Sequence, residues 1–262
     1  MGIVNVTPDS FSDGGRFLQP DAAVDYALRL VEEGAAIIDV GGESTRPGAV
    51  QPSEETEIRR VVPVIERLAA DLSVPISVDT SRASVIRAAT RAGASVVNDI
   101  RALREPGAFD AVLEADCAVC LMHMRGTPRD MQMRTDYRDL VEEVSVFLRK
   151  RVHACVDSGM APNRIMLDPG FGFSKTLAHN MELLRRLPEL LDLGYPLLVG
   201  LSRKASIGLI TGRDRPRDRL AGSLAAAVIA AWLGASIVRA HDVKDTVEAL
   251  AIVSAVREGD KA

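Results

Sequence analysis

The sequence is poor in the features that mark secreted, membrane-spanning and nucleic-acid-binding proteins. Three cysteines in 262 residues are too few for a disulfide framework. The most apolar run, residues 225–233, is far shorter than the ~20 residues that a spanning helix needs. A net charge of −4 gives no reason to expect a nucleic-acid partner. We therefore expect a cytoplasmic protein without a membrane or nucleic-acid partner.

Two further signals are also missing. The start, MGIVNVTPDS, has no charged segment followed by an apolar one, so we do not interpret it as a secretory signal. Cys117 and Cys120 have the CxxC spacing of redox and metal sites, but they fall in a strand-like stretch, where an offset of three residues points to opposite faces. We interpret both as small buried core residues.

What the sequence does contain is a regular alternation of short apolar runs and amphipathic stretches. The expected strands are Gly2–Val6, Ala36–Val40, Ile76–Asp79, Ser95–Asn98, Ala118–Met122, Arg164–Asp168, Leu197–Gly200 and Ser236–Arg239. Helices are expected near 21–33, 54–71, 82–92, 106–115, 137–158, 179–193, 218–233 and 243–257. Eight strand–helix units predict an α/β fold, a (β/α)8 TIM barrel formed as one domain over residues 1–262. The alternative is an open doubly wound sheet, whose G-x-G-x-x-G fingerprint is missing after the first strand.

A partial internal repeat favours the barrel. Residues 34–39, 93–98 and 234–239 each begin with glycine, continue with a small residue and a β-branched pair, and end on a polar residue. Glycine suits the left-handed cap that ends a helix. We expect the polar residues Asp39, Asn98 and Arg239 to stand at the carboxyl ends of their strands.

In a TIM barrel, those strand ends and the loops after them build the active site. Polar side chains gather at these positions: Asn5, Asp39, Asp79, Asn98, Asp99, His123, Asp168, Ser202, Arg203, Lys204, Arg239, His241 and Asp242. A single aspartate there can simply cap the next helix or hold a neighbouring site residue by a hydrogen bond, alternatives that stay open for Asp39 and Asp99. The whole set together predicts a site.

The set divides into two chemical halves. Asp79, Asn98, Asp168 and Lys204 offer the mixed donors and acceptors that a buried, nitrogen-rich heterocycle requires. The other half supplies groups for an anion such as a phosphate, which TIM barrels commonly bind near the last strands: Asn5, Arg46, Arg239 and His241. The amide oxygen of Asn5 could also bind Mg2+, with diphosphate oxygens and water completing the sphere.

The motifs MGIVNVTPDSFSDGG, IIDVGGESTRPGA, ISVDTS, VNDI, LMHMRG, LDPGFGFSK, VGLSRK and VRAHDV resemble the successive signatures of the dihydropteroate synthases, in the family's order and from end to end. The resemblance implies transfer of a 6-hydroxymethyl-dihydropterin group from its diphosphate ester to p-aminobenzoate, releasing diphosphate. We expect a dissociative, SN1-like displacement from which loops exclude water. It also implies Mg2+ as cofactor, competition by sulfonamides and a homodimer, with which the apolar stretch 222–234 is compatible.

The resemblance also assigns residues. It places the pterin on Asp79, Asn98, Met124, Asp168, Phe173 and Lys204, and p-aminobenzoate on Phe11, Thr45, Arg46, Pro47 and Ser202. It places the diphosphate on Asn5, Arg46, Arg239 and His241, with Mg2+ on Asn5. The residues implied in catalysis are Asp9, Asp79, Asp168, Lys204, Arg239 and His241.

Two departures from the family pattern and two rival functions remain. The chain begins inside the first expected strand, and Ser174 stands where the family typically has glycine, a costly exchange if that position requires a positive φ.

One rival function is that of a pterin-binding methyltransferase acting on a corrinoid protein, which would have no use for TRPG or SRK. The other is a non-catalytic pterin-binding barrel, which should have lost one of Asn5, Arg46, Lys204 and His241.

Overall fold

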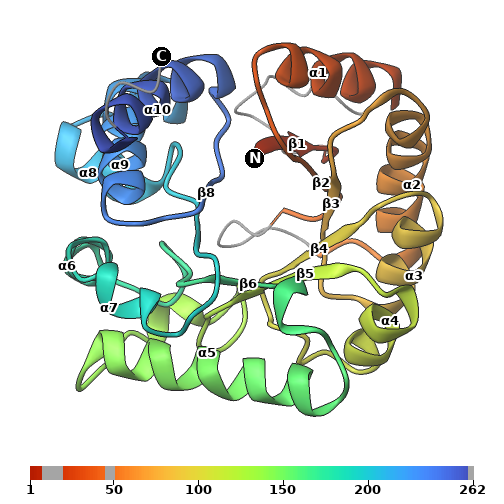
Figure 1. Cartoon of the computed structure of the whole chain (residues 1–262), viewed down its shortest axis with the longest axis horizontal. Coiled ribbons are helices and arrows are strands. Elements are labelled where there is room, and N and C mark those ends of the chain that lie inside the picture. The colour runs from red at the N-terminus through yellow and green to blue at the C-terminus, as the bar shows by residue number, and fades with distance from the viewer. Residues whose placement is uncertain (8–19, 45–50, 259–262) are drawn as a thin grey trace.

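The chain folds into a closed ring of parallel strands surrounded by helices (Figure 1). The structure is a computed structural model, and it describes residues 1–7, 20–44 and 51–258. The strands are β1 (Gly2–Asn5), β2 (Ile38–Gly41), β3 (Ile76–Asp79), β4 (Val96–Asp99), β5 (Ala118–Met122), β6 (Ile165–Asp168), β7 (Leu198–Val199) and β8 (Ile237–Val238). The predicted strands are all present, within about two residues at each end.

The ring consists of two sheets joined at two seams. Strands β1 to β6 pair in chain order, and β7 pairs with β8, all in parallel. Single bridges join Leu167 of β6 to Leu197 before β7, and Ala240 after β8 to Gly2 of β1. The predicted parallel (β/α)8 barrel is thereby confirmed, and the open doubly wound alternative is wrong.

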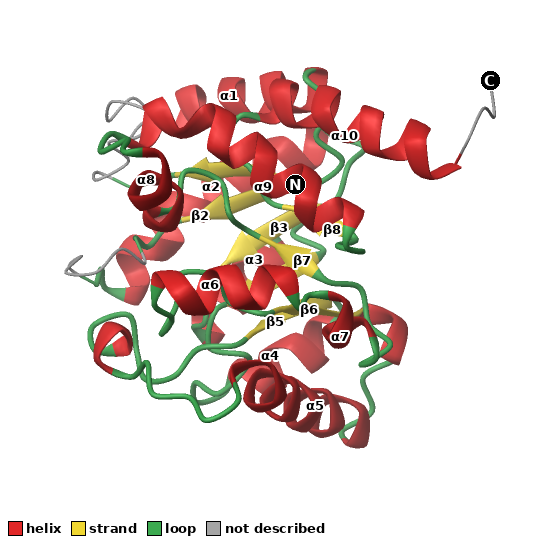
Figure 2. Ribbon diagram, turned by 90° about the vertical axis from the view of Figure 1, so that its left-hand side faces the viewer, coloured by secondary structure: helices red, strands yellow, loops and turns green. Residues whose placement is uncertain are grey.

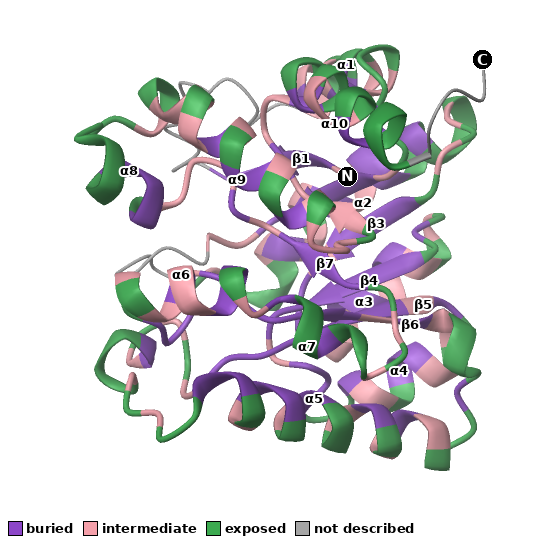
Figure 3. Ribbon diagram, turned by 60° about the vertical axis from the view of Figure 1, so that its left-hand side comes forward, coloured by how far each residue is buried: buried purple, intermediate pink, exposed green. Residues whose placement is uncertain are grey.

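Helices form the outer layer, with their outward faces exposed and the strands buried (Figure 3). They are α1 (Pro20–Glu32), α2 (Glu54–Asp71), α3 (Ala83–Arg91), α4 (Ala108–Ala115), α5 (Leu140–Asp157), α6 (Leu177–Arg185), α7 (Pro188–Leu191), α8 (Ala205–Thr211), α9 (Leu220–Trp232) and α10 (Val243–Glu258). In the described part of the chain, no helix has the length and apolarity needed to cross a membrane.

The helices differ from the predicted ones in two places. The stretch expected as one helix over 179–193 is divided into α6 and α7, because Pro188 has no N–H to donate and begins a new helix at its first turn. Helix α8 was not predicted at all. It lies in the loop after β7, where the polar SRK motif precedes it.

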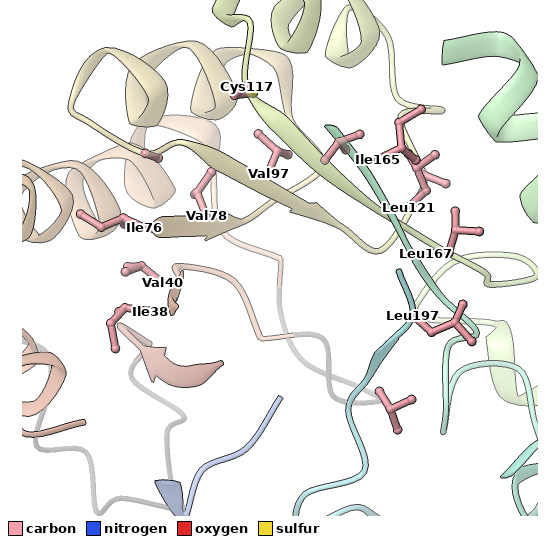
Figure 4. Packing of buried hydrophobic residues seen from close by; sticks show 14 of the residues in the cluster. Ile38, Val40, Ile76, Val78, Val97, Cys117, Leu121, Ile165, Leu167 and Leu197 are labelled. Carbon is pink, nitrogen blue, oxygen red and sulfur yellow. The ribbon is translucent and has the colours of Figure 1, made fainter. Parts of the chain in front are cut away.

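The strands alternate between an outer apolar face and an inner face, as the two-residue period of a strand requires, and the inner face of β2 and β3 is polar. Figure 4 shows the outward side chains, among them Ile38 and Val40, packed together between the sheet and the helices. The residues between them in sequence point into the barrel. Asp79 and Asn98 are register partners there, whereas Asp39 pairs with Ser77 one layer deeper. The prediction that Asp39 ends its strand was therefore wrong, because β2 continues to Gly41.

The glycines of the internal repeat have the predicted left-handed conformation. The φ angles of Gly34, Gly93 and Gly234 are +100°, +118° and +106°. At Gly93 the space is also restricted, because an added Cβ would stand 2.4 Å from the Cβ of Ala69 on α2. Glycine is required at this turn for both its conformation and its size.

Replacing Gly93 with alanine should destabilise the protein more than the same change at Gly159. Both residues have positive φ, +118° and +97°, but no described atom lies within 4 Å of a Cβ at Gly159. The left-handed conformation costs alanine about 1 kcal/mol, and the clash at Gly93 should add about 1–3 kcal/mol. Urea denaturation measures both free energies of unfolding. Equal losses would show that α2 and α3 separate at Gly93 without cost.

Candidate active site

A cavity of about 660 Å³ opens at the carboxyl ends of the strands. Helix α8 and the long loop between β5 and α5 project from this end of the barrel (Figure 2). Side chains on the strands and the loops after them line the cavity, including Asn5, Asp79, Phe173, Ser202, Lys204, Arg239 and His241. The structure therefore brings together at one opening residues from both predicted halves of the site.

The predicted heterocycle half lies partly on the cavity wall and partly behind it. Asp79, Phe173 and Lys204 line the cavity, and the Lys204 ammonium lies 4.3 Å from the centre of the Phe173 ring. Asn98 and Asp168 are buried, with 4% and 8% of their surfaces exposed. This wall combines an aromatic face with buried hydrogen-bonding groups, the combination that a flat polar heterocycle requires.

An apolar cluster completes this wall. Ile100, Met122, Met124, Met131 and Phe173 pack together, and Met131 also lines the cavity. Met124 and Phe173 were predicted here, but Met131 was not. It lies on a short 3-10 helix, Met131–Met133, in the loop after β5, and no motif in the sequence marks it.

Burial shifts the charges of this half toward neutrality. It raises the pKa of Asp79 to about 7, against the opposing effect of Arg239. It also raises the pKa of Asp168, which an N–H of Gly170 and the ammonium of Lys204 partly offset. Burial lowers the pKa of Lys204 to about 8, with Asp168 acting in the other direction. Groups with pKa values this close to neutrality respond readily to a ligand's charge.

Arg239 connects the two predicted halves. Its Nε donates to Asp39 Oδ2 at 2.6 Å, and its Nη2 donates to Asp79 Oδ2 at 2.9 Å. The sequence had assigned Arg239 to the anion half only. In the structure its guanidinium is held between the fully buried carboxylate of Asp39 and the carboxylate of Asp79 on the cavity wall, and it lies beside the heterocycle half as well.

In the anion half, Ser202 contacts His241, although the family resemblance places Ser202 at p-aminobenzoate and His241 at the diphosphate. The Nδ1 of His241 and the Oγ of Ser202 are 3.1 Å apart, and the His241 N–H donates to the same hydroxyl at 3.1 Å. Asn5 lines the same cavity and lies beside Asp79, since its Oδ1 and the Oδ2 of Asp79 are 3.6 and 3.9 Å from the point where a Cβ on Gly41 would stand. Glycine at this position leaves space between the amide and the carboxylate.

A buried lysine that was not among the predicted site residues holds the loop after β6. The Nζ of Lys175 contacts His123 Nδ1 at 3.0 Å and the carbonyl oxygens of Gly170 and Phe173 at 3.0 and 3.1 Å. Burial lowers the pKa of Lys175 to about 7. The only sequence signal was its place beside the FGF segment, and a lysine in a loop is usually exposed.

Ser174 has the positive φ that makes serine a costly replacement for glycine. Its φ is +49°, in the left-handed region. Its hydroxyl accepts the N–H of Arg125 at 3.0 Å and lies 3.2 Å from the hydroxyl of Tyr137. The side chain thus links the loops after β5 and β6, an interaction that glycine could not make.

The predicted Mg2+ ligand is Asn5, the first residue of the anion half. Among the described residues, no three His, Cys, Asp or Glu side chains gather as a metal cluster. Asn5 offers one neutral amide oxygen at the cavity, a hard ligand that suits Mg2+ held mainly by substrate oxygens and water. The remaining predicted residues, Asp9, Phe11, Thr45, Arg46 and Pro47, lie outside the described part of the chain.

Comparisons with known proteins agree with this geometry. The sequence profile of the family described as "Pterin binding enzyme" matches residues 1–241. The dihydropteroate synthase of Escherichia coli (strain K12) is 52% identical over 255 residues, which cover 97% of this chain and 90% of that protein. The Haemophilus influenzae dihydropteroate synthase is 47% identical over 253 residues, which cover 96% of this chain and 91% of that protein.

Solved structures show the same relationship. The Yersinia pestis dihydropteroate synthase in complex with a sulfonamide drug has a TM-score of 0.96 and 52% identity, covering 99% of this chain and 94% of that one. The Xanthomonas albilineans dihydropteroate synthase with 7,8-dihydropteroate has a TM-score of 0.89 and 50% identity, covering 98% and 92%. This chain therefore belongs to the pterin-binding enzymes and, among them, to the dihydropteroate synthase family.

Proposed function

We propose that this protein is a dihydropteroate synthase, which joins 6-hydroxymethyl-7,8-dihydropterin diphosphate to p-aminobenzoate and releases diphosphate. The observation that carries the proposal is the single cavity in which Asp79 and Lys204 lie beside Arg239 and His241, in a chain similar to this family over nearly its whole length. Related structures from Xanthomonas albilineans contain 4-aminobenzoic acid and 7,8-dihydropteroate, which are a substrate and the product of this reaction.

The pterin is proposed to bind against the heterocycle half of the cavity. Its amino and ring N–H groups would donate to Asp79, Asp168 and the free oxygen of Asn98, while Lys204 would donate to a ring acceptor. Phe173 and Met124 would pack against the ring faces, since both belong to the apolar cluster behind the cavity. Each buried polar edge then has a partner of the opposite type, which keeps the cost of desolvation low.

The anion half is proposed to stabilise the departing diphosphate. Asn5, Arg239 and His241 reach the cavity from β1 and from the end of β8, and Ser202 holds His241 in place. Mg2+ bound through Asn5 and the substrate would neutralise negative charge on the leaving group. Asp79 and Asp168 lie on the pterin side, where they would stabilise positive charge as the bond to diphosphate breaks.

An arylamine is largely unprotonated at neutral pH and needs no strong base before it attacks. The demanding step is therefore departure of diphosphate, which favours the dissociative displacement. Ser202 is proposed to border the p-aminobenzoate position, because it lines the same cavity beside Lys204. Asp9, Phe11, Thr45, Arg46 and Pro47 are proposed to complete it on the family resemblance alone.

A homodimer is also proposed, formed through the outer faces of α9 and α10. Helix α9 buries Ala226 and Ala230 against the barrel, but Trp232 at its end is 55% exposed. Ile252 and Val256 on α10 are 67% and 64% exposed. Large apolar side chains gathered on adjacent helices favour a protein–protein contact.

A cytoplasmic location is proposed from the cysteines. Cys117, Cys120 and Cys155 are free and buried, and burial raises the pKa of the Cys117 and Cys155 thiols to about 11. Unpaired thiols persist most readily in a reducing compartment.

Diphosphate release should require both the pterin diphosphate and p-aminobenzoate, and should fall sharply when EDTA removes Mg2+. Enzyme-coupled detection of diphosphate measures it, with each substrate omitted in turn and with excess Mg2+ restoring the rate. Pterin turnover that does not depend on p-aminobenzoate would contradict the synthase function and would favour a methyltransferase-like barrel or another pterin enzyme. Pterin binding without any turnover would favour the non-catalytic alternative.

The Lys204→Ala variant should bind pterin about 10- to 100-fold more weakly, because a charge-assisted hydrogen bond contributes about 1.5–3 kcal/mol. Isothermal titration calorimetry with 6-hydroxymethylpterin measures the affinity. Lys244→Ala is the matched control, since Lys244 is exposed on α10, away from the cavity lining. Unchanged affinity in Lys204→Ala would remove this residue from the pterin position.

The Trp232→Glu variant should convert a dimer to a monomer, because a charge would be buried in the proposed contact. Sedimentation velocity of the wild type and the variant measures the assembly. Leu209→Glu serves as the control, since Leu209 is 71% exposed on α8 instead. A monomeric wild type, or dissociation by Leu209→Glu alone, would contradict the proposed surface.

A further inference from the structure

Asp39 lies too deep in the barrel to touch a substrate. It is on β2, paired in register with Ser77 and one layer below Asp79 and Asn98. Its side chain is 0% exposed. Any effect of Asp39 on the reaction must therefore act through another residue.

One oxygen of Asp39 accepts hydrogen bonds from a residue of each half of the site. Asp39 Oδ2 accepts Asn98 Nδ2 at 3.1 Å and Arg239 Nε at 2.6 Å. Asp39 Oδ1 is buried and accepts no hydrogen bond within the described residues. A buried carboxylate with one unsatisfied oxygen is unfavourable for stability, so its presence here favours a role in the site.

The contact with Asn98 determines which end of that amide faces Asp39. A carboxylate can only accept hydrogen bonds, so the Asn98 NH2 group must turn toward Asp39 and donates one of its two N–H groups to it. The carbonyl oxygen is then presented on the other side of the amide, and no described residue donates to it. The position of the Asn98 carbonyl oxygen as an acceptor is thereby fixed.

The contact with Arg239 has a different consequence. Arg239 Nη2 also bonds to Asp79 Oδ2 at 2.9 Å. The second carboxylate draws the Nε edge of the guanidinium toward the barrel interior and keeps Arg239 from pairing with Asp79 alone. Asp79 then retains accepting capacity for a ligand, and the remaining guanidinium edge stays available at the cavity.

We propose that Asp39 is a positioning residue that fixes the carbonyl oxygen of Asn98 as an acceptor and divides Arg239 between two carboxylates. The ligand recognised through this arrangement is a heterocycle that presents an amino donor to the Asn98 oxygen. This inference rests on the proposed function and explains how the site distinguishes a pterin from related heterocycles.

The test compares two ligands that differ at and beside position 2 of the ring. 6-Hydroxymethylpterin has a 2-amino donor next to an acceptor nitrogen, whereas 6-hydroxymethyllumazine has an oxygen next to an N–H, so both groups are mismatched. The wild type should favour the pterin by about 100-fold in Kd, because each mismatched hydrogen bond costs about tenfold. In Asp39→Asn the new amide can donate or accept, so Asn98 can turn and the preference should fall by about tenfold.

Ser77→Ala is the matched control. Ser77 lies in the same layer, is equally buried, and its hydroxyl has no partner among the described residues. It should leave the ligand preference unchanged. A folded Asp39→Asn protein with the wild-type preference would overturn the proposal, as would an equal loss in Ser77→Ala.

A second measurement applies if Asp39→Asn does not fold. In the ligand-free wild type, NMR hydrogen exchange should show the Asn98 side-chain amide protected relative to that of the exposed Asn163. Equal exchange rates would overturn the proposal. A wild type that binds neither ligand would contradict the proposed function, while the exchange measurement would still report on Asp39 and Asn98.

Discussion

The ion pairs of Arg239 with Asp39 and Asp79 are the interaction on which the site depends. They join the residue that follows β8 to β2 and β3, which lie 200 and 160 residues away in sequence. Three charged groups in a barrel interior carry a large desolvation cost, which close geometry can offset only if the partners stay paired. The surrounding structure meets that condition, because Asp39 also binds Asn98. The register of the strands fixes the positions of Asp39, Asp79 and Asn98 along the barrel axis.

Much of the fold follows from the sequence, because its pattern is local. The strands alternate inward and outward residues, and the glycines of the repeat mark where helices must turn back. The end of β2 was misplaced because Gly41 carries no side chain to continue the alternation. Helix α8 was missed because it lies in a region where the polar SRK motif had already been interpreted as a loop.

The site was less predictable than the fold. The polar residues at the strand ends could be selected because a parallel barrel brings those ends together. The hydrogen-bond partners of these residues could not be predicted. The pairing of Arg239 with Asp39, for example, depends on the layer at which each side chain enters the barrel. Met131 and Lys175 had no distinguishing pattern. Lys175 is recognisable only once the loop after β6 is seen to fold over it.

The two seams of the barrel have a consequence for how the site forms. Asp39, Asp79, Asn98 and Asp168 belong to the six-stranded sheet, whereas Lys204, Arg239 and His241 follow the two strands of the smaller sheet. Each half of the cavity takes residues from both sheets, since Asn5 of the anion half is on β1 and Lys204 of the heterocycle half follows β7. Binding competence is thus a property of the closed ring. A ligand that contacts both sheets stabilises the ring across its seams, so occupancy and cooperative folding are thermodynamically linked.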